Sequence, residues 1–156
     1  MSETESMQSA ANPPLHGAVY RSAPMIHVAD VEASVSFYSM LGFNVCSRFQ
    51  TDDGITRWAD IRSHRAQFML ARATAPILAA EQAVLFYLYS LDVRSLRDYL
   101  IDRGIPNAGA PPMEGIESPP PNGAAVFDIV PRFYMPAGEL RIHDPDGYCL
   151  LVGQID

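Results

Sequence analysis

The hydrophobic positions of this chain follow one pattern twice, and the two copies lie 62 positions apart. In each copy an apolar run ends at an Asp-Val pair, two large apolar residues follow seven and eight positions after the Asp, and a Gly comes twelve positions after it. The Asp and Gly are Asp30 and Gly42 in the first copy, and Asp92 and Gly104 in the second. One supersecondary unit used twice explains this spacing.

Each copy predicts one helix. Asp30 and Asp92 stand where an N-cap accepts hydrogen bonds from free backbone N–H groups, and Gly42 and Gly104 stand where a left-handed C-cap belongs. Within the first helix, one apolar stripe at a 3.6-residue period is expected. Its members are Ala33, Phe37, Met40 and Leu41. Val93, Leu96 and Leu100 form the corresponding stripe of the second helix.

Short apolar runs around these helices predict strands, separated by turn sequences. The strands are expected at 25–29, 43–50, 56–62, 66–73, 84–90, 138–143 and 148–154. The sequences Asp-Asp-Gly at 52–54 and Asp-Pro-Asp-Gly at 144–147 favour tight turns. We interpret 1–22 as a tail, 74–83 as the connection between the copies, and the Pro-rich stretch 106–123 as a loop over a site or a dimer contact.

Alternation along the strands separates two faces, because successive side chains of a strand point to opposite sides of the sheet. One face is aliphatic or Phe throughout, as a face covered by helices must be. It carries Ile26, Val28, Phe86, Leu88, Leu140, Ile142, Leu150 and Val152. The other face mixes polar, aromatic and sulfur-containing residues, which suits a concave surface that holds a ligand. Its candidate ligand-binding residues are Met25, His27, Trp58, Asp60, Met69, Tyr87, Tyr89, Glu139, Arg141 and Cys149.

The amino-acid composition limits which kinds of partner the chain can have. With 156 residues, 48% of them hydrophobic, the chain suits one globular domain, and its net charge of −7 opposes binding to nucleic acid. Cys46 and Cys149 are too few for a disulfide framework and lack the paired spacing of a zinc site. No apolar run approaches a membrane span, and the first residues are acidic, unlike a signal peptide. We therefore expect a cytoplasmic protein with no membrane partner.

The opening Val-Ala-Asp-Val with Phe37-Tyr38 and the closing Arg-Ile-His-Asp-Pro-Asp-Gly-Tyr at 141–148 resemble the vicinal oxygen chelate superfamily. That superfamily contains glyoxalases, extradiol dioxygenases, fosfomycin-resistance enzymes and bleomycin-resistance proteins. The resemblance implies an α+β fold, in which two βαβββ modules form a curved mixed sheet around a concave cup, with the helices on the outer face. It covers a single domain at 23–156, with module one at about 23–73, a linker at 74–83 and module two at about 84–154.

Enzymes of this superfamily hold a divalent metal with His, Gln or Glu at four places. The corresponding positions here are Ala23, Ala71, Leu85 and Leu151, none of which can donate a lone pair to a metal. The sequence therefore predicts that the superfamily metal site is absent and that no cofactor is bound.

Without that site, the chain is most similar in style to the metal-free bleomycin-resistance branch. We therefore predict a metal-free protein that sequesters an aromatic or cationic small molecule in a cup at a homodimer interface. The alternative is a glyoxalase-, lyase- or dioxygenase-like enzyme. It would use a metal improvised from His27 and His143, or cofactorless acid-base chemistry through His27, with Arg141 stabilising an anion. A structural or regulatory subunit is a third interpretation.

Individual residues leave further alternatives open. Tyr87 and Tyr89 could stack on a planar ligand or simply line the sheet. Trp58 and Asp60 could accept a cationic group, or Trp58 could pack in a dimer interface. His27 could equally be a hydrogen-bonded core histidine, and an exposed Arg–Glu pair is an alternative interpretation of residues 139 and 141, with 143 at the rim.

Overall fold

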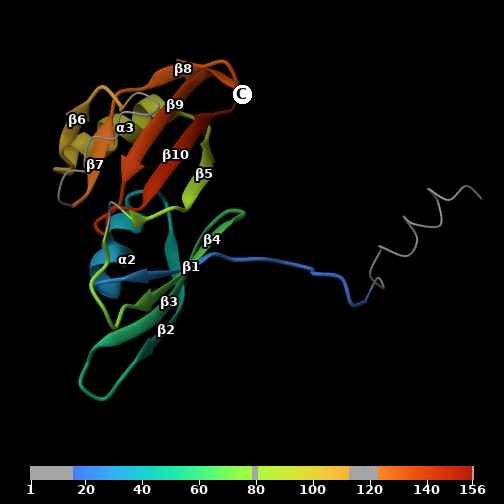
Figure 1. The fold of residues 1–156 in the computed structure, drawn as a ribbon, viewed down its shortest axis with the longest axis vertical. Coiled ribbons are helices and arrows are strands. Elements are labelled where there is room, and N and C mark those ends of the chain that lie inside the picture. The colour runs from blue at the N-terminus through green and yellow to red at the C-terminus, as the bar shows by residue number, and fades with distance from the viewer. Residues whose placement is uncertain (1–15, 79–80, 113–122, 156) are drawn as a thin grey trace, which may run out of the picture.

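The computed structural model describes residues 16–78, 81–112 and 123–155. It divides the strands between two mixed sheets (Figure 1). Module one contributes β1 (Met25–Val28), α2 (Val31–Ser39), β2 (Asn44–Gln50), β3 (Thr56–Ser63) and β4 (Ala66–Arg72), with the strand order β1-β4-β3-β2. Module two contributes β5 (Leu85–Ser90), α3 (Val93–Asp102), β6 (Asn107–Gly109), β7 (Ala125–Phe127), β8 (Val130–Arg132), β9 (Met135–His143) and β10 (Cys149–Gln154). The predicted α+β class is confirmed.

The two sheets repeat one arrangement. In module two the order is β5-β10-β9-β7-β6, so β5, β10 and β9 take the places of β1, β4 and β3. The register agrees as well, because Met25 lies opposite Met69 in module one, and Tyr87, its repeat equivalent, lies opposite Leu151 in module two. The 62-residue repeat is therefore a repeat of strand pairing.

The second module holds three short strands where the residue pattern predicted none. β7 and β8 follow one another along β9 and together occupy the place of β2, and β6 lies beyond β7 within the Pro-rich stretch. Each of the three has only three residues, and β8 includes Pro131, so none shows a recognisable alternation. The loop predicted at 106–123 is thus wrong for Asn107–Gly109, and its part at 113–122 lies outside the described residues.

Both helices begin at the predicted caps. A carboxylate oxygen of Asp30 accepts from the backbone N of Ala33 at 3.1 Å, and Asp92 accepts from Ser95 at 3.0 Å. The buried side of α2 consists of Val31, Ser34, Phe37 and Tyr38, so the predicted stripe was wrong at Ala33, which is exposed. Across the described ranges, neither helix is long and apolar enough to cross a membrane.

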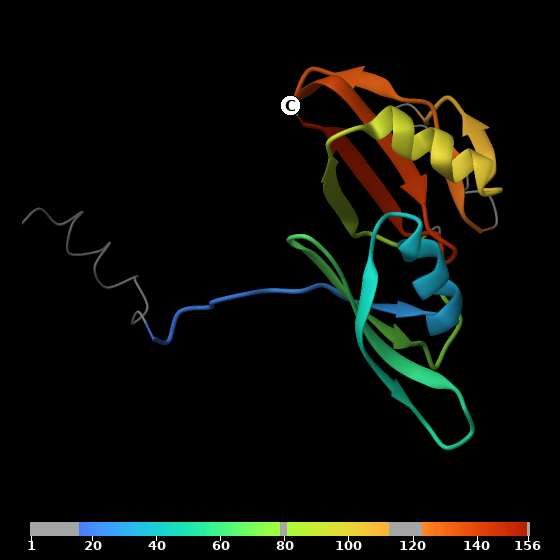
Figure 2. The ribbon, with the colours of Figure 1, turned by 180° about the vertical axis from the view of Figure 1, so that it is seen from behind.

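The helices cover one side of the two sheets, as the opposite views of Figures 1 and 2 show. α2 packs against β2, β3 and β4, and α3 packs against β7, β9 and β10. The strand residues predicted to face the helices are buried, apart from the half-buried Leu88. Burial of this apolar face is the main contribution to the stability of each module.

The closing turn of module two is bonded to module one. The Tyr38 hydroxyl donates to Asp144 at 2.7 Å, the backbone N of Ala29 donates to Asp146 at 3.0 Å, and the Tyr148 hydroxyl donates to the carbonyl of His27 at 2.7 Å. We call these three bonds the inter-module clamp. Pro145 and the positive φ of Gly147 make the turn that presents both carboxylates, as the sequence predicted.

Aromatic rings join the modules beside the clamp. Phe68 of β4 lies 5.0 Å from Phe86 of β5, measured between ring centroids, and 5.4 Å and 5.5 Å from Tyr38 and Phe43. Phe68 is fully buried, so this aromatic cluster is a single core shared by both modules.

Candidate functional site

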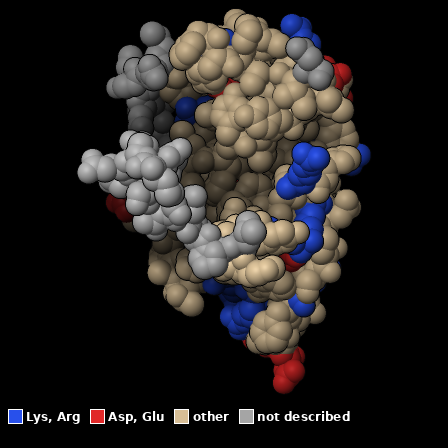
Figure 3. All heavy atoms as spheres, turned by 90° about the vertical axis from the view of Figure 1, so that its right-hand side faces the viewer, with Lys and Arg blue, Asp and Glu red and all other residues tan. Residues whose placement is uncertain are grey.

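A cavity of about 770 Å³ lies between β5 and the turn that joins β3 to β4. We call it the inter-module cavity. Its apolar wall comes from Pro24, Leu41, Phe43 and Phe68 of module one, and from Leu85, Phe86, Leu88, Leu96, Val152 and Ile155 of module two. Tyr87 and Tyr89 of β5 also line it. Figure 3 shows a hollow lined chiefly by uncharged residues, with arginine side chains along its border.

Four aromatic side chains form a row that starts at this cavity, where the first two line it. The rings of Tyr87 and Tyr89 are 5.3 Å apart, Tyr134 lies 6.5 Å from Tyr87, and Phe133 lies 5.1 Å from Tyr134. We call this row the aromatic ladder. Alternation along β5 identified Tyr87 and Tyr89, whereas Phe133 and Tyr134 lie in the β8–β9 turn, where no periodic signal exists.

Tyr87 is held in place by Glu139. Its hydroxyl donates to Glu139 at 3.0 Å, and burial, followed by this bond, raises the pKa of Tyr87 well above its usual value. Glu139 is only 5% exposed and also forms an ion pair with Arg132 at 3.5 Å. The interpretation of Glu139 and Arg141 as an exposed ion pair was therefore wrong, because Glu139 is buried and its partners are Tyr87 and Arg132.

Arg141 instead bonds a neutral histidine. Its Nε donates to Nε2 of His143 at 3.0 Å, and its guanidinium lies 5.6 Å from the centroid of the Phe127 ring. His143 is buried, not at the rim as predicted from its position before the turn. Burial, with a further effect of Arg141, lowers the pKa of His143 to about 4, so the imidazole is neutral at pH 7.

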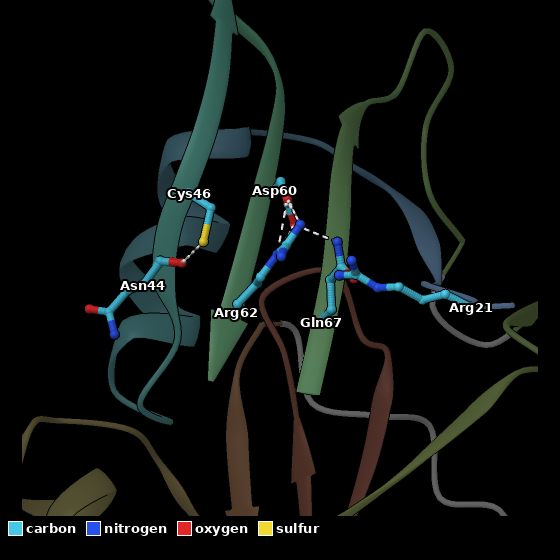
Figure 4. A network of polar contacts seen from close by, with 6 residues as sticks. All are labelled: Arg21, Asn44, Cys46, Asp60, Arg62 and Gln67. Atoms are coloured by element: carbon cyan, nitrogen blue, oxygen red, sulfur yellow. Dashed lines mark hydrogen bonds and ion pairs between the residues drawn. The ribbon is translucent and has the colours of Figure 1, made fainter. Parts of the chain in front are cut away.

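Asp60 is also neutralised within the protein (Figure 4). Its carboxylate accepts from Arg62 at 2.8 Å and from the Gln67 amide at 2.9 Å, and Arg21 donates to Gln67 from the segment before β1. The bond from Arg62 is the main cause of the lowered pKa of Asp60. Cys46, whose thiol donates to the Asn44 carbonyl, is exposed beside this network.

The remaining candidate ligand-binding residues are divided between the two sheets. His27 is exposed, and Ala71 separates it from the half-buried Trp58. Met25 is 58% exposed and lies opposite Met69. Cys149 is buried beside Leu85 on β5, and burial raises the pKa of its thiol. The structure thus places His27, Trp58 and Asp60 on one sheet, and Arg141 and Cys149 on the other.

The four positions of the superfamily metal site can now be assigned from strand pairing. Leu151 lies opposite Tyr87, and the equivalent position in module one is Met69, opposite Met25, not Ala71 as the sequence suggested. The set is therefore Ala23, Leu85, Leu151 and Met69. Hydrocarbon groups and one thioether do not fit a divalent metal. No group of three His, Cys, Asp or Glu residues suited to a metal occurs in the described parts of the chain.

No protein-family model matches the chain, and no curated protein matches it either. Several solved structures do resemble it in fold. A bleomycin resistance determinant encoded on the transposon Tn5 superposes with a TM-score of 0.62 at 14% identity, covering 88% of this chain and 99% of that one. A bleomycin-binding protein from Streptomyces verticillus, complexed with copper(II)-bleomycin, gives 0.60 at 18% identity, covering 89% and 98%. An antibiotic-binding protein from Streptomyces sp. CB03234 gives 0.55 at 16% identity, covering 89% and 99%.

Proposed function

We propose that the chain binds a small aromatic molecule in the inter-module cavity and holds it unchanged, in a cup that a second copy completes. The proposal starts from the fold, which is that of the bleomycin-binding proteins, as the predicted resemblance to the vicinal oxygen chelate superfamily implies. The observation that carries the proposal is the aromatic ladder beside an open apolar cavity. Tyr89 is 63% exposed and Leu85 59%, and large apolar side chains grouped in this way mark binding surfaces.

The geometry favours the aromatic ligand class over the cationic one that the sequence left open. Asp60 and Glu139 were the acidic candidates for a cation, and each already has an arginine partner. Removing such a partner from a buried carboxylate is costly. Tyr89 and the exposed ring of Phe133 are, in contrast, available for stacking.

Binding without turnover is supported by the donor chemistry. The four superfamily positions hold no metal ligand, and the two residues of the acid-base alternative, His27 and Arg141, lie on different sheets. Solved neighbours with this fold include a bleomycin-binding protein complexed with bleomycin. Metal analysis of protein purified without chelator addresses the enzyme alternative, since a stoichiometric metal retained through dialysis would favour it.

Replacing Tyr89 by alanine is expected to weaken binding of an aromatic ligand by about tenfold, because one exposed stacking surface is lost, worth about 1.4 kcal/mol. The ligand is selected from a thermal-shift panel of aromatic metabolites and bleomycin, and its Kd is measured by calorimetry. Tyr99→Ala is the matched control, since Tyr99 is an exposed tyrosine of α3. The proposal is overturned if no compound binds, or if both variants weaken binding equally.

The second copy is proposed from two open strand edges. Among the described strands, β1 pairs only with β4 and β5 only with β10, and Met25, Leu85 and Tyr89 are exposed there. Exposed apolar edges favour association. We expect light scattering to give twice the 17.1 kDa chain mass, whereas a monomer at ligand-binding concentrations would contradict this part of the proposal.

A further inference from the structure

We propose that the ligand carries an oxyanion, and that it places this group in an arginine-lined groove at one end of the inter-module cavity. The inference deepens the proposed function and rests on it. The groove, about 450 Å³ in volume, is lined by Arg21, Ser22, Pro24, Arg62, His64, Arg65, Ala66 and Gln67. We call it the arginine groove.

The arginine groove adjoins the inter-module cavity. Pro24 and the β3–β4 turn, including His64 and Arg65, line both. A ligand with an aromatic body among Tyr87, Tyr89 and the apolar wall would therefore extend a substituent directly into the groove. Such a molecule meets an uncharged surface at one end and guanidinium groups at the other.

The charge of the groove is positive, although the whole chain carries −7. Asp60 forms its ion pair with Arg62, and the charge of Arg21, which donates to the uncharged amide of Gln67, also helps to lower the pKa of Asp60. Arg65 is exposed, and no carboxylate of the described residues pairs with it. Three guanidinium groups thus share one carboxylate in the groove, which leaves a net positive charge for an external partner. Their planar donor geometry matches carboxylate, sulfonate and phosphate oxygens.

The β3–β4 turn has an unusual backbone and carries two residues of the groove. His64 has a φ of +50°, the only positive φ of a non-glycine residue in the described chain. Ser63 pairs with Ala66, so His64 is the first central residue of a two-residue hairpin loop, where a positive φ favours glycine. The two residues of this loop, His64 and Arg65, both line the arginine groove, so the loop presents an imidazole and a guanidinium to the same space.

The test compares three probes that share one aromatic body: naphthoate, naphthamide and naphthylmethylammonium. We expect wild-type protein to bind naphthoate about tenfold more tightly than the amide and to bind the ammonium most weakly, with the difference reduced by salt. Naphthyl phosphate, added as a fourth probe, shows whether the groove prefers a carboxylate or a phosphate ester.

Arg65→Gln and Arg21→Gln are each expected to bring the ratio of naphthoate to naphthamide affinity toward one. Arg94→Gln is the matched control, because Arg94 is an exposed arginine of α3 outside both cavities. His64→Gly is expected to reduce the same ratio while leaving Tm unchanged or higher, since glycine relieves the positive φ.

The outcomes separate this inference from the function on which it rests. If the amide and the carboxylate bind equally and Arg65→Gln has no effect, the oxyanion inference is overturned while small-molecule binding stands. An effect of Arg94→Gln as large as that of Arg65→Gln overturns it too, because the preference would then reflect overall charge. If the thermal-shift panel yields a ligand but none of these probes binds, the oxyanion inference is overturned; if no compound of either set binds, the proposed function itself fails.

Discussion

Asp144→Ala is expected to lower the free energy of unfolding by about 3–6 kcal/mol, because three donors lose their acceptor inside the protein. The carboxylate accepts from the Tyr38 hydroxyl at 2.7 Å and from the backbone N of Asp146 and of Tyr148 at 2.9 Å each. Asp144 is fully buried, so water does not replace these bonds. In a chain of this length the loss corresponds to a decrease in Tm of about 10–20 °C.

Asp144→Asn is the matched variant, and it isolates the charge. The asparagine oxygen still accepts from the turn, and the Tyr38 hydroxyl can rotate to meet the amide, so a much smaller loss is expected near pH 4. Burial raises the pKa of Asp144 from 3.8 to about 6, so the folded state holds the proton more tightly than the unfolded state. Proton binding to Asp144 therefore stabilises the folded state fully below pH 3.8, and this stabilisation is lost as the pH rises through 6.

The free energy of unfolding of wild type minus that of Asp144→Asn should therefore fall by about 2 kcal/mol between pH 4 and pH 7. His143 has the opposite effect, since its lowered pKa of about 4 destabilises the protein as the pH falls below 6.5, but it is common to both proteins and cancels in the difference. Urea unfolding at several pH values measures the quantity. A difference that does not change with pH would contradict the buried, proton-binding role of Asp144.

Phe68→Ala is expected to cost about 3–5 kcal/mol, the usual loss for truncating a buried phenylalanine. Phe68 contacts rings from both modules, so the void forms where α2, β4 and β5 meet. Because Phe68 also lines the inter-module cavity, the variant should additionally accept bulkier aromatic ligands than wild type when assayed by thermal shift.

Phe49→Ala provides the control for Phe68. Phe49 lies on the outer strand β2 and is 58% exposed, so a change of no more than about 0.5 kcal/mol is expected. Equal losses for both variants, determined by denaturant unfolding, would show that the aromatic cluster is not the shared core described above.

Much of the fold was readable from local patterns. The repeat located both helices and their caps, because an N-capping Asp and a closing Gly act within a single helix. Alternation assigned Ile26 and Leu150 to the buried face and Tyr89 to the open face. β7 and β8 were missed because each has only three residues, and β8 includes a proline, so their pairing depends on β9 and not on a pattern of their own.

The candidate site was predictable only in part. Tyr87 and Tyr89 follow from strand alternation, but the cavity beside them forms where the β3–β4 turn of one module meets the edge of the other. Which carboxylates remain available also depends on side-chain pairing. Asp60 looked like a cation-binding residue until Arg62, two positions later, proved to neutralise it.

The repeated strand register has one more consequence. Pairing with Met69 and Leu151 makes Asp60 and Arg141 occupants of equivalent positions, and by the same rule Trp58 corresponds to Glu139. The two modules share one strand register but carry different types of side chain at equivalent positions. The surface that the two modules build is therefore not symmetric, because Trp58 and Asp60 in one module stand at the positions that Glu139 and Arg141 occupy in the other.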